Sequence, residues 1–121
     1  MLNQYRWKSR VLVVSAPRYD DENLRAQRDG FASTIGEFAD RDMVLVTLLD
    51  DTISTADYRE LTEAEVTAAR MALGILPGSF ALRLIGKDGS VKLSSDSATP
   101  MTEIYTLIDS MPMRQRETSD R

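Results

Sequence analysis

Residues 80–95 read FALRLIGKDGSVKLSS, and this stretch decides how the sheet of the protein ends. Apolar and polar positions alternate over residues 80–86, and a second short alternating run covers residues 91–94. The tip between the two runs contains Asp88-Gly89, and an Asp-Gly pair reaches positive φ with little strain. Two alternating runs joined in this way are typical of a β-hairpin. The sequence therefore predicts an antiparallel pair of strands here.

Two continuous apolar runs precede this hairpin. Residues 10–15 (RVLVVS) and 43–49 (MVLVTLL) do not alternate, which indicates strands that are buried on both faces, as in a parallel sheet. Between the runs, apolar residues recur at helical spacing, so we expect one amphipathic helix over residues 21–39. A strand, a helix and a strand in this order form a right-handed crossover between two parallel strands.

Two more helices and a loop complete the pattern. Residues 50–59 are polar and predict a loop, after which Thr62 and Glu65 have the spacing of a capping box for a helix that ends at Gly74. After the hairpin, Thr99-Pro100 begins a last helix. The resulting order is thioredoxin-like: an α/β fold with a mixed sheet of about four main strands, two parallel and then a hairpin, with helices on both faces. A flavodoxin-like receiver fold is the alternative, but its sheet is all-parallel and leaves no place for the hairpin.

The length of 121 residues suits one domain, which we expect to span residues 1–113. The last eight residues mix both signs of charge, so we interpret residues 114–121 as a flexible, solvated tail. No apolar run approaches the ~20 residues of a membrane helix, so we expect a soluble chain without a membrane span. The first ten residues lack the apolar segment of a secretory signal, so we expect no signal peptide in this chain. A net charge of −4 argues against nucleic acid as a partner.

The chain contains no cysteine and no histidine. These absences exclude thiol redox chemistry, Cys/His zinc sites and imidazole acid–base catalysis by this chain. We therefore expect no cofactor, and no catalytic residue stands out.

Two long stretches resemble a known family. Residues 5–17 (YRWKSRVLVVSAP) form the first stretch, and the second runs from residues 84–93 (LIGKDGSVKL) to residues 108–117 (IDSMPMRQRE). With the Arg41-Asp42 step, they are similar to a bacterial domain-of-unknown-function family. The same domain occurs in animal sushi-repeat-containing and coiled-coil-containing extracellular matrix proteins. The resemblance implies a thioredoxin-like fold related to peroxiredoxins, without an established activity, and leaves a periplasmic or secreted location open.

The chain departs from the catalytic relatives of that family at the reactive loop. Peroxiredoxins place a proline, a threonine and the peroxidatic cysteine after the first core strand. Here residues 15–24 (SAPRYDDENL) keep Pro17 but have neither threonine nor cysteine. Arg18 and Tyr19 occupy the place of the lost redox loop. A ligand or partner could use the groove beside Pro17, Arg18 and Tyr19, and the alternative is a plain turn.

Acidic residues follow both parallel strands, where open α/β sheets bind ligands. Clustered carboxylates are what Mg²⁺ or Ca²⁺ needs, so these residues form a candidate metal site: Asp20, Asp21, Asp50 and Asp51. The alternative, favoured by the absence of a calcium-loop pattern, is that one aspartate caps the helix and the others are solvated.

Arg83 lies within the apolar strand of residues 80–85 and is a further candidate for holding an anionic ligand. The alternative is a structural arginine that is paired or that extends to solvent. These observations favour a non-enzymatic binding or interaction module with an unknown protein or small-molecule partner. A thiol-free enzyme or a divalent-ion-dependent site that uses the acidic residues is the alternative function.

Overall fold

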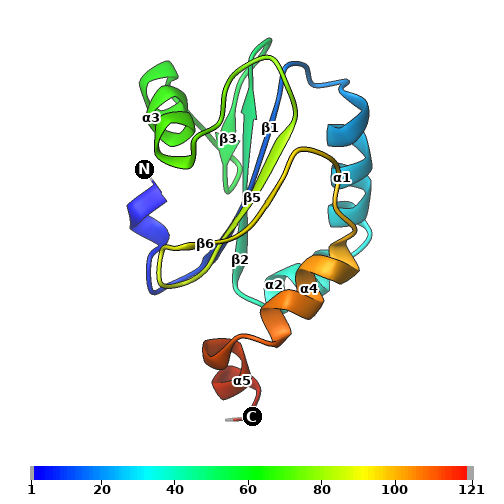
Figure 1. The fold of residues 1–121 in the computed structure, drawn as a ribbon, viewed down its shortest axis with the longest axis vertical. Helices are drawn as coiled ribbons and strands as arrows, with labels where there is room; N and C mark the ends of the chain where they lie inside the picture. Colours follow the sequence, from blue (N-terminus) through cyan, green and yellow to red (C-terminus); the bar gives the residue numbers. More distant parts are fainter. Residues whose placement is uncertain (1, 120–121) are drawn as a thin grey trace.

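The computed structural model describes residues 2–119, and its centre is one sheet in the order β4-β3-β2-β1-β5-β6 (Figure 1). The strands are β1 (Arg10–Ala16), β2 (Met43–Leu49), β3 (Thr55–Ala56), β4 (Arg59–Glu60), β5 (Ala81–Ile85) and β6 (Val91–Ser95). The helices are the 3₁₀ helix η1 (Leu2–Tyr5), α1 (Glu22–Ala32), α2 (Ile35–Asp40), α3 (Glu63–Leu73), α4 (Met101–Asp109) and α5 (Pro112–Ser119).

Strand β1 is the central strand, and all seven of its residues are buried. It pairs in parallel with β2, with Val13 opposite Val46, and antiparallel with β5, with Val13 opposite Arg83. Because both neighbours and both faces cover it, a continuous apolar run suits this position better than an alternating one. The predicted parallel pair followed by an antiparallel hairpin is confirmed.

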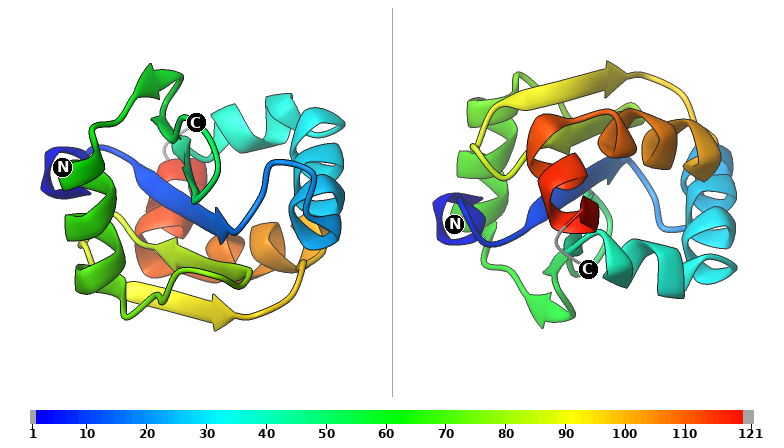
Figure 2. Two further views of the ribbon diagram at one scale, coloured as in Figure 1. Left: turned by 90° about the horizontal axis from the view of Figure 1, so that it is seen from above. Right: turned by 90° about the horizontal axis from the view of Figure 1, so that it is seen from below.

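Helices cover both faces of the sheet, as predicted (Figures 1 and 2). Leu12 and Val14 of β1 face α1, α2 and α4 in the larger core cluster. Val11 and Val13 face the opposite way, into the cluster that α3 covers. Successive side chains of a strand point to opposite faces, so one strand supplies both cores. Among residues 2–119, no helix combines the length and the apolar character that crossing a membrane requires.

The hairpin forms at the predicted place, and its tip contains Gly89 at φ 86°. The carboxylate of Asp88 accepts hydrogen bonds from the backbone N–H of Ser90 at 3.0 Å and from its hydroxyl at 2.8 Å. Helix α3 begins at the predicted capping box of Thr62 and Glu65, and ends at Gly74 with φ 66°. These are short-range features, which is why the sequence predicts them.

The structure differs from the expected single helix over residues 21–39, because the chain breaks between α1 and α2. The hydroxyl of Thr34 donates to the carbonyl of Gly30 at 2.7 Å, and it forms a second hydrogen bond with the hydroxyl of Tyr105, also at 2.7 Å. Side-chain bonds of this kind compete with the helical backbone pattern. The sheet has six strands rather than about four, because β3 and β4 form a small hairpin within the polar segment expected to be a loop.

The expected tail also differs from the structure over residues 114–119. These residues belong to α5, and the side chain of Arg114 is only 4% exposed. The mixture of charges suggests a solvated segment, but these side chains find partners on distant elements. Residues 120–121 of the expected tail lie outside the described residues.

Candidate functional site

The loops that follow β1 and β2 meet at the carboxyl edge of the sheet, where ligands bind in open α/β folds (Figure 1). Pro17, Arg18 and Tyr19 lie in the first loop, and Asp50 and Asp51 begin the second. The backbone N–H of Tyr19 donates to Asp51 Oδ1 at 3.2 Å, which joins the two loops. The structure therefore brings these sequence-predicted residues to one edge.

The first two carboxylates of the predicted metal site serve local contacts. Asp21 caps α1 by accepting a hydrogen bond from the backbone N–H of Leu24 at 3.1 Å. Asp20 pairs with Arg18 at 3.1 Å on the exposed surface. Within residues 2–119, no group of three or more carboxylate side chains converges in a way that could hold a metal ion. The four aspartates therefore lie at one edge without forming a common ligand set.

Asp50 belongs instead to a contact that the sequence analysis missed. Arg70 of α3 forms an ion pair with Asp50, and its Nε donates to the hydroxyl of Ser15 at 3.3 Å. Asp50 also accepts a hydrogen bond from the backbone N–H of Gly78 at 2.8 Å. Arginine stays protonated in proteins, so it cannot act as a base toward the buried hydroxyl of Ser15. The only sequence signal for this contact is an arginine near the end of an amphipathic helix.

Arg83, the other predicted anion-binding residue, lies away from this edge on the face that α3 covers. Its Nε donates to the carbonyl of Leu73 at 3.3 Å, and its Nη1 donates to the carbonyl of Leu82 at 3.0 Å. Leu73 is the last residue of α3, where the partial negative charge of the helix end favours a cation. Arg83 is therefore half-buried with carbonyl partners.

A groove of about 850 Å³ opens between α1 and the strands β2 and β3. Three large side chains at this groove are mostly exposed: Tyr19 at 56%, Ile53 at 57% and Tyr58 at 82%. Phe31 of α1 and Leu45 of β2 contribute apolar walls. We call this feature, marked by Tyr19, Ile53 and Tyr58, the Tyr58 groove.

Tyr58 lies at the tip of the β3–β4 hairpin in a backbone conformation that tyrosine rarely adopts. Ala56 pairs with Arg59, so Asp57 and Tyr58 form a two-residue turn with φ 49° and 68°. Two-residue hairpin turns with positive φ at both positions favour Asn-Gly or Asp-Gly, because glycine has no Cβ to clash. Here a tyrosine occupies the place where glycine would be more stable.

Tyr19 is exposed but held in position. The guanidinium of Arg28 stacks over its ring at 3.9 Å from the centroid. The same guanidinium donates to the carbonyl of Tyr19 at 3.2 Å. Together with the hydrogen bond from the backbone N–H of Tyr19 to Asp51, these interactions hold the exposed ring of Tyr19 in position.

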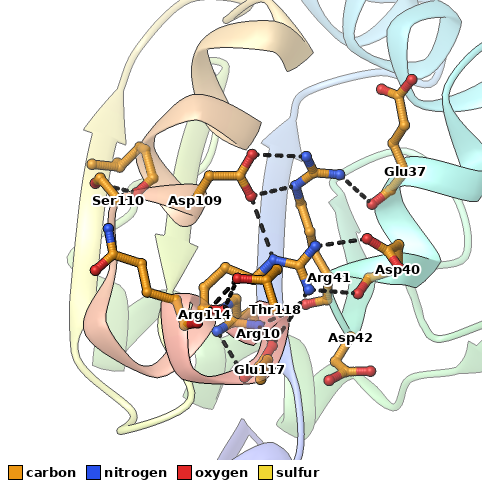
Figure 3. Close-up of polar contacts among 12 residues, drawn as sticks. Arg10, Glu37, Asp40, Arg41, Asp42, Asp109, Ser110, Arg114, Glu117 and Thr118 are labelled. Carbon is orange, nitrogen blue, oxygen red and sulfur yellow. Dashed lines mark hydrogen bonds and ion pairs between the residues drawn. The ribbon is translucent and has the colours of Figure 1, made fainter. Parts of the chain in front are cut away.

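A second set of charged residues lies at the opposite edge of the sheet, around α5 (Figure 3). Arg10 at the start of β1 forms two hydrogen bonds with the carboxylate of Glu117, at 3.2 and 3.1 Å. Lys87 at the hairpin tip contacts the same carboxylate at 2.8 Å. Burial opposes ionisation of Glu117, but the hydrogen bonds from Arg10 and Lys87 outweigh it and lower the pKa of Glu117 to about 2.

Arg114 makes the second attachment of α5. It donates to the carboxylate of Asp40 at 2.6 Å and contacts Asp109 at 3.4 Å (Figure 3). Arg41 holds Asp109 with two hydrogen bonds, at 3.0 and 2.9 Å, and these bonds lower the pKa of Asp109. The motif residues Arg41, Lys87, Arg114 and Glu117 therefore attach the C-terminal helix to the amino edge of the sheet.

Comparisons with known proteins agree with this architecture. A sequence model of the family described as Domain of unknown function (DUF4174) matches residues 1–117. Coiled-coil domain-containing protein 80 of Danio rerio is 31% identical over 134 residues, which cover 96% of this chain. The chain spans only 15% of the length of that relative.

Solved peroxiredoxin structures share the fold. The reduced 2-Cys peroxiredoxin of Plasmodium vivax superposes with a TM-score of 0.67 at 15% identity, over 95% of this chain and 84% of that one. Thioredoxin peroxidase I of Plasmodium yoelii gives 0.66 at 16% identity, over 95% and 79%. This likeness confirms the predicted thioredoxin-like, peroxiredoxin-related fold, and the chain has the fold without any cysteine.

Proposed function

The chain belongs to the family described as Domain of unknown function (DUF4174), and we propose that it is a non-enzymatic module that binds a protein partner through the Tyr58 groove. The fold is that of peroxiredoxins, but the chain has no thiol or imidazole. The hydroxyl of Ser15, near the carboxyl end of β1, is buried and accepts a hydrogen bond from the guanidinium of Arg70. The carboxyl edge of the sheet therefore provides an exposed surface for binding rather than a reactive group.

The observation that carries the proposal is the conformation and exposure of Tyr58. A non-glycine residue at φ 68° costs of order 1 kcal/mol, and an 82% exposed side chain recovers almost nothing by packing. Folding alone therefore gives no reason for tyrosine at this turn position. Strained residues concentrate at functional sites, and exposed tyrosines are enriched at protein interfaces.

The chemistry of the groove suits a protein segment that presents an apolar side chain. Tyr19, Ile53 and Tyr58 surround apolar walls, while Arg28, Asp29 and Asp51 at the same groove offer charges of both signs. Such a mixture matches an interface with an apolar centre and a polar rim better than a site for a single ion.

Selection from a library of short random peptides tests the proposal. We expect enriched peptides to bind the chain and to lose at least about tenfold in affinity against a variant with Tyr19→Ser, Ile53→Ser and Tyr58→Ser. The matched control is Met71→Ser with Leu76→Ser, which removes two side chains that are 79% and 78% exposed outside the groove. Equal binding to the groove variant would place the binding surface elsewhere and overturn the proposal.

Turnover assays test the non-enzymatic part separately. We expect the purified chain to show no catalytic turnover of hydrogen peroxide with a thiol reductant and to reduce no disulfide, because without cysteine no residue can form a sulfenic acid or a mixed disulfide. Turnover above that of the heat-denatured chain would refute this part.

A further inference from the structure

A small cavity lies between the tip of the β5–β6 hairpin and the junction of α4 with α5. Its volume is about 380 Å³. It is remote from the Tyr58 groove, because the end of β5 pairs with the start of β1 rather than with its carboxyl end. Leu107, Met111 and Met113 line the side formed by the helices. The other lining residues include Arg10, Lys87 and Lys92, so the cavity has an apolar wall and a cationic wall.

Arg10 in the cationic wall carries a buried donor without an acceptor. The residue is 1% exposed, and its two terminal nitrogens donate to Glu117 and to the carbonyl of Arg41. Its Nε has no hydrogen-bond partner among the residues that the structure describes. This Nε atom is fully buried, so a ligand oxygen does not reach it, and Arg10 acts on the cavity through its positive charge.

The two lysines of the cavity also retain donor capacity. Lys87 Nζ donates to Asp42 and Glu117, each at 2.8 Å, and Lys92 Nζ donates to Asp88 at 3.0 Å. An ammonium group has three donors, so each lysine has at least one left. Asp88 is the carboxylate on this wall, and its oxygens are taken by Ser90 and Lys92.

The start of α5 adds a further attraction for an anion. The helix begins at Pro112, and the residue before it, Met111, has no side-chain oxygen to cap it. In the described part of the chain, no side chain accepts a hydrogen bond from the backbone N–H of Met113 or Arg114. The partial positive charge of a helix start therefore lies at a cavity that Pro112 and Met113 line.

We infer that this cavity binds a small amphipathic carboxylate, whose anionic head accepts from Lys92 and the start of α5 beside the positive charge of Arg10, while its hydrocarbon tail packs against Leu107, Met111 and Met113. The cationic wall suits the carboxylate of such a ligand, and the apolar wall suits its hydrocarbon tail. A neutral apolar molecule would leave the remaining donors of Lys92 without a ligand acceptor, and a bare anion would leave the apolar wall in contact with water. This site is independent of the Tyr58 groove and of the proposed function.

Titration of the whole chain with octanoate, followed by amide chemical shifts, tests the site. We expect saturable shifts at Leu107, Met113 and the hairpin tip. Acetate and inorganic phosphate lack the tail, and octanol lacks the charge, so each should bind at least about tenfold more weakly than octanoate. Equal binding of octanol and octanoate, or shifts confined to the Tyr58 groove, would overturn the inference.

Two single substitutions of lysine, one inside the cavity and one outside it, provide the test variant and its matched control. Lys92→Gln removes a cation from the cavity wall, and we expect octanoate affinity to fall by about tenfold. Lys8→Gln removes the same charge from an exposed position outside the cavity, and affinity should stay within about twofold of the unmodified chain. An equal loss in both variants would indicate attraction by the overall field and contradict a built site. If Lys92→Gln does not fold, the comparison of octanoate, octanol and acetate on the unmodified chain decides alone.

Discussion

Replacing Tyr58 by glycine should make the protein more stable, although it deletes a large side chain. At φ 68° the Cβ of an L-residue is strained by about 1–2 kcal/mol, and glycine removes this strain. Glycine also adds about 0.4–1 kcal/mol of chain entropy to the unfolded state, which offsets part of the gain. Little packing is lost, because the tyrosine is 82% exposed. We therefore expect a net gain of roughly 0.5–1 kcal/mol.

Tyr58→Ala is the control, because alanine also loses the ring but keeps the strained Cβ. Glycine should exceed alanine in unfolding free energy by about 1 kcal/mol, or a few degrees in melting temperature for a chain of this size. Urea denaturation followed by far-ultraviolet circular dichroism measures this difference. Trp7 fluorescence is unsuitable as the reporter, because this residue is 61% exposed.

The same two variants distinguish the effect of backbone strain at Tyr58 on stability from the effect of its ring on peptide binding. Both should lose affinity for the selected peptides, since both lack the phenol ring, while only glycine gains stability. If the glycine variant is no more stable than the alanine variant, Tyr58 is not strained. The main reason for assigning it a binding role would then disappear.

Four further predictions concern other parts of the molecule. Glu117→Gln should lower the unfolding free energy by roughly 2–3 kcal/mol at pH 7, because it breaks the buried pair with Arg10; urea denaturation measures this, and no loss would contradict the attachment of α5. Since the pKa of Glu117 is lowered to about 2 from 4.5, its contribution is present above pH 4.5 and is lost as the pH falls toward 2; an acid titration of the glutamine variant should show a shallower decline in stability. Thr62→Ala should cost about 1 kcal/mol through loss of the α3 cap, measured by thermal melting, and an unchanged melting temperature would show that the capping box is dispensable. Calorimetry with Mg²⁺ or Ca²⁺ should give no saturable heat, because Asp21 and its neighbours make separate contacts; a heat that Asp21→Asn abolishes would restore the ion-site hypothesis.

The candidate site was predictable in part. The loop of Pro17, Arg18 and Tyr19 lies at the carboxyl edge because it follows a central parallel strand, and the sequence pattern identifies that strand. Tyr58 and Arg70 carried no such signal. The strain at Tyr58 arises from the pairing of β3 with β4, which are two residues long, and the role of Arg70 depends on how α3 lies against β1. Short strands and helix rotations leave almost no trace in composition or periodicity.

The hairpin, the buried strands and the capped start of α3 follow from the sequence, because each depends on residues within a few positions of one another. Folding alone decided the rest. Helix α1 stops where Thr34 meets Tyr105, which is 71 residues away, and the charged C-terminal segment is ordered because Glu117 meets Arg10 across 107 residues. A charge on a helix surface looks the same in sequence whether water or a distant partner neutralises it. Only tertiary packing distinguishes the two, because it decides which charges lose their contact with water.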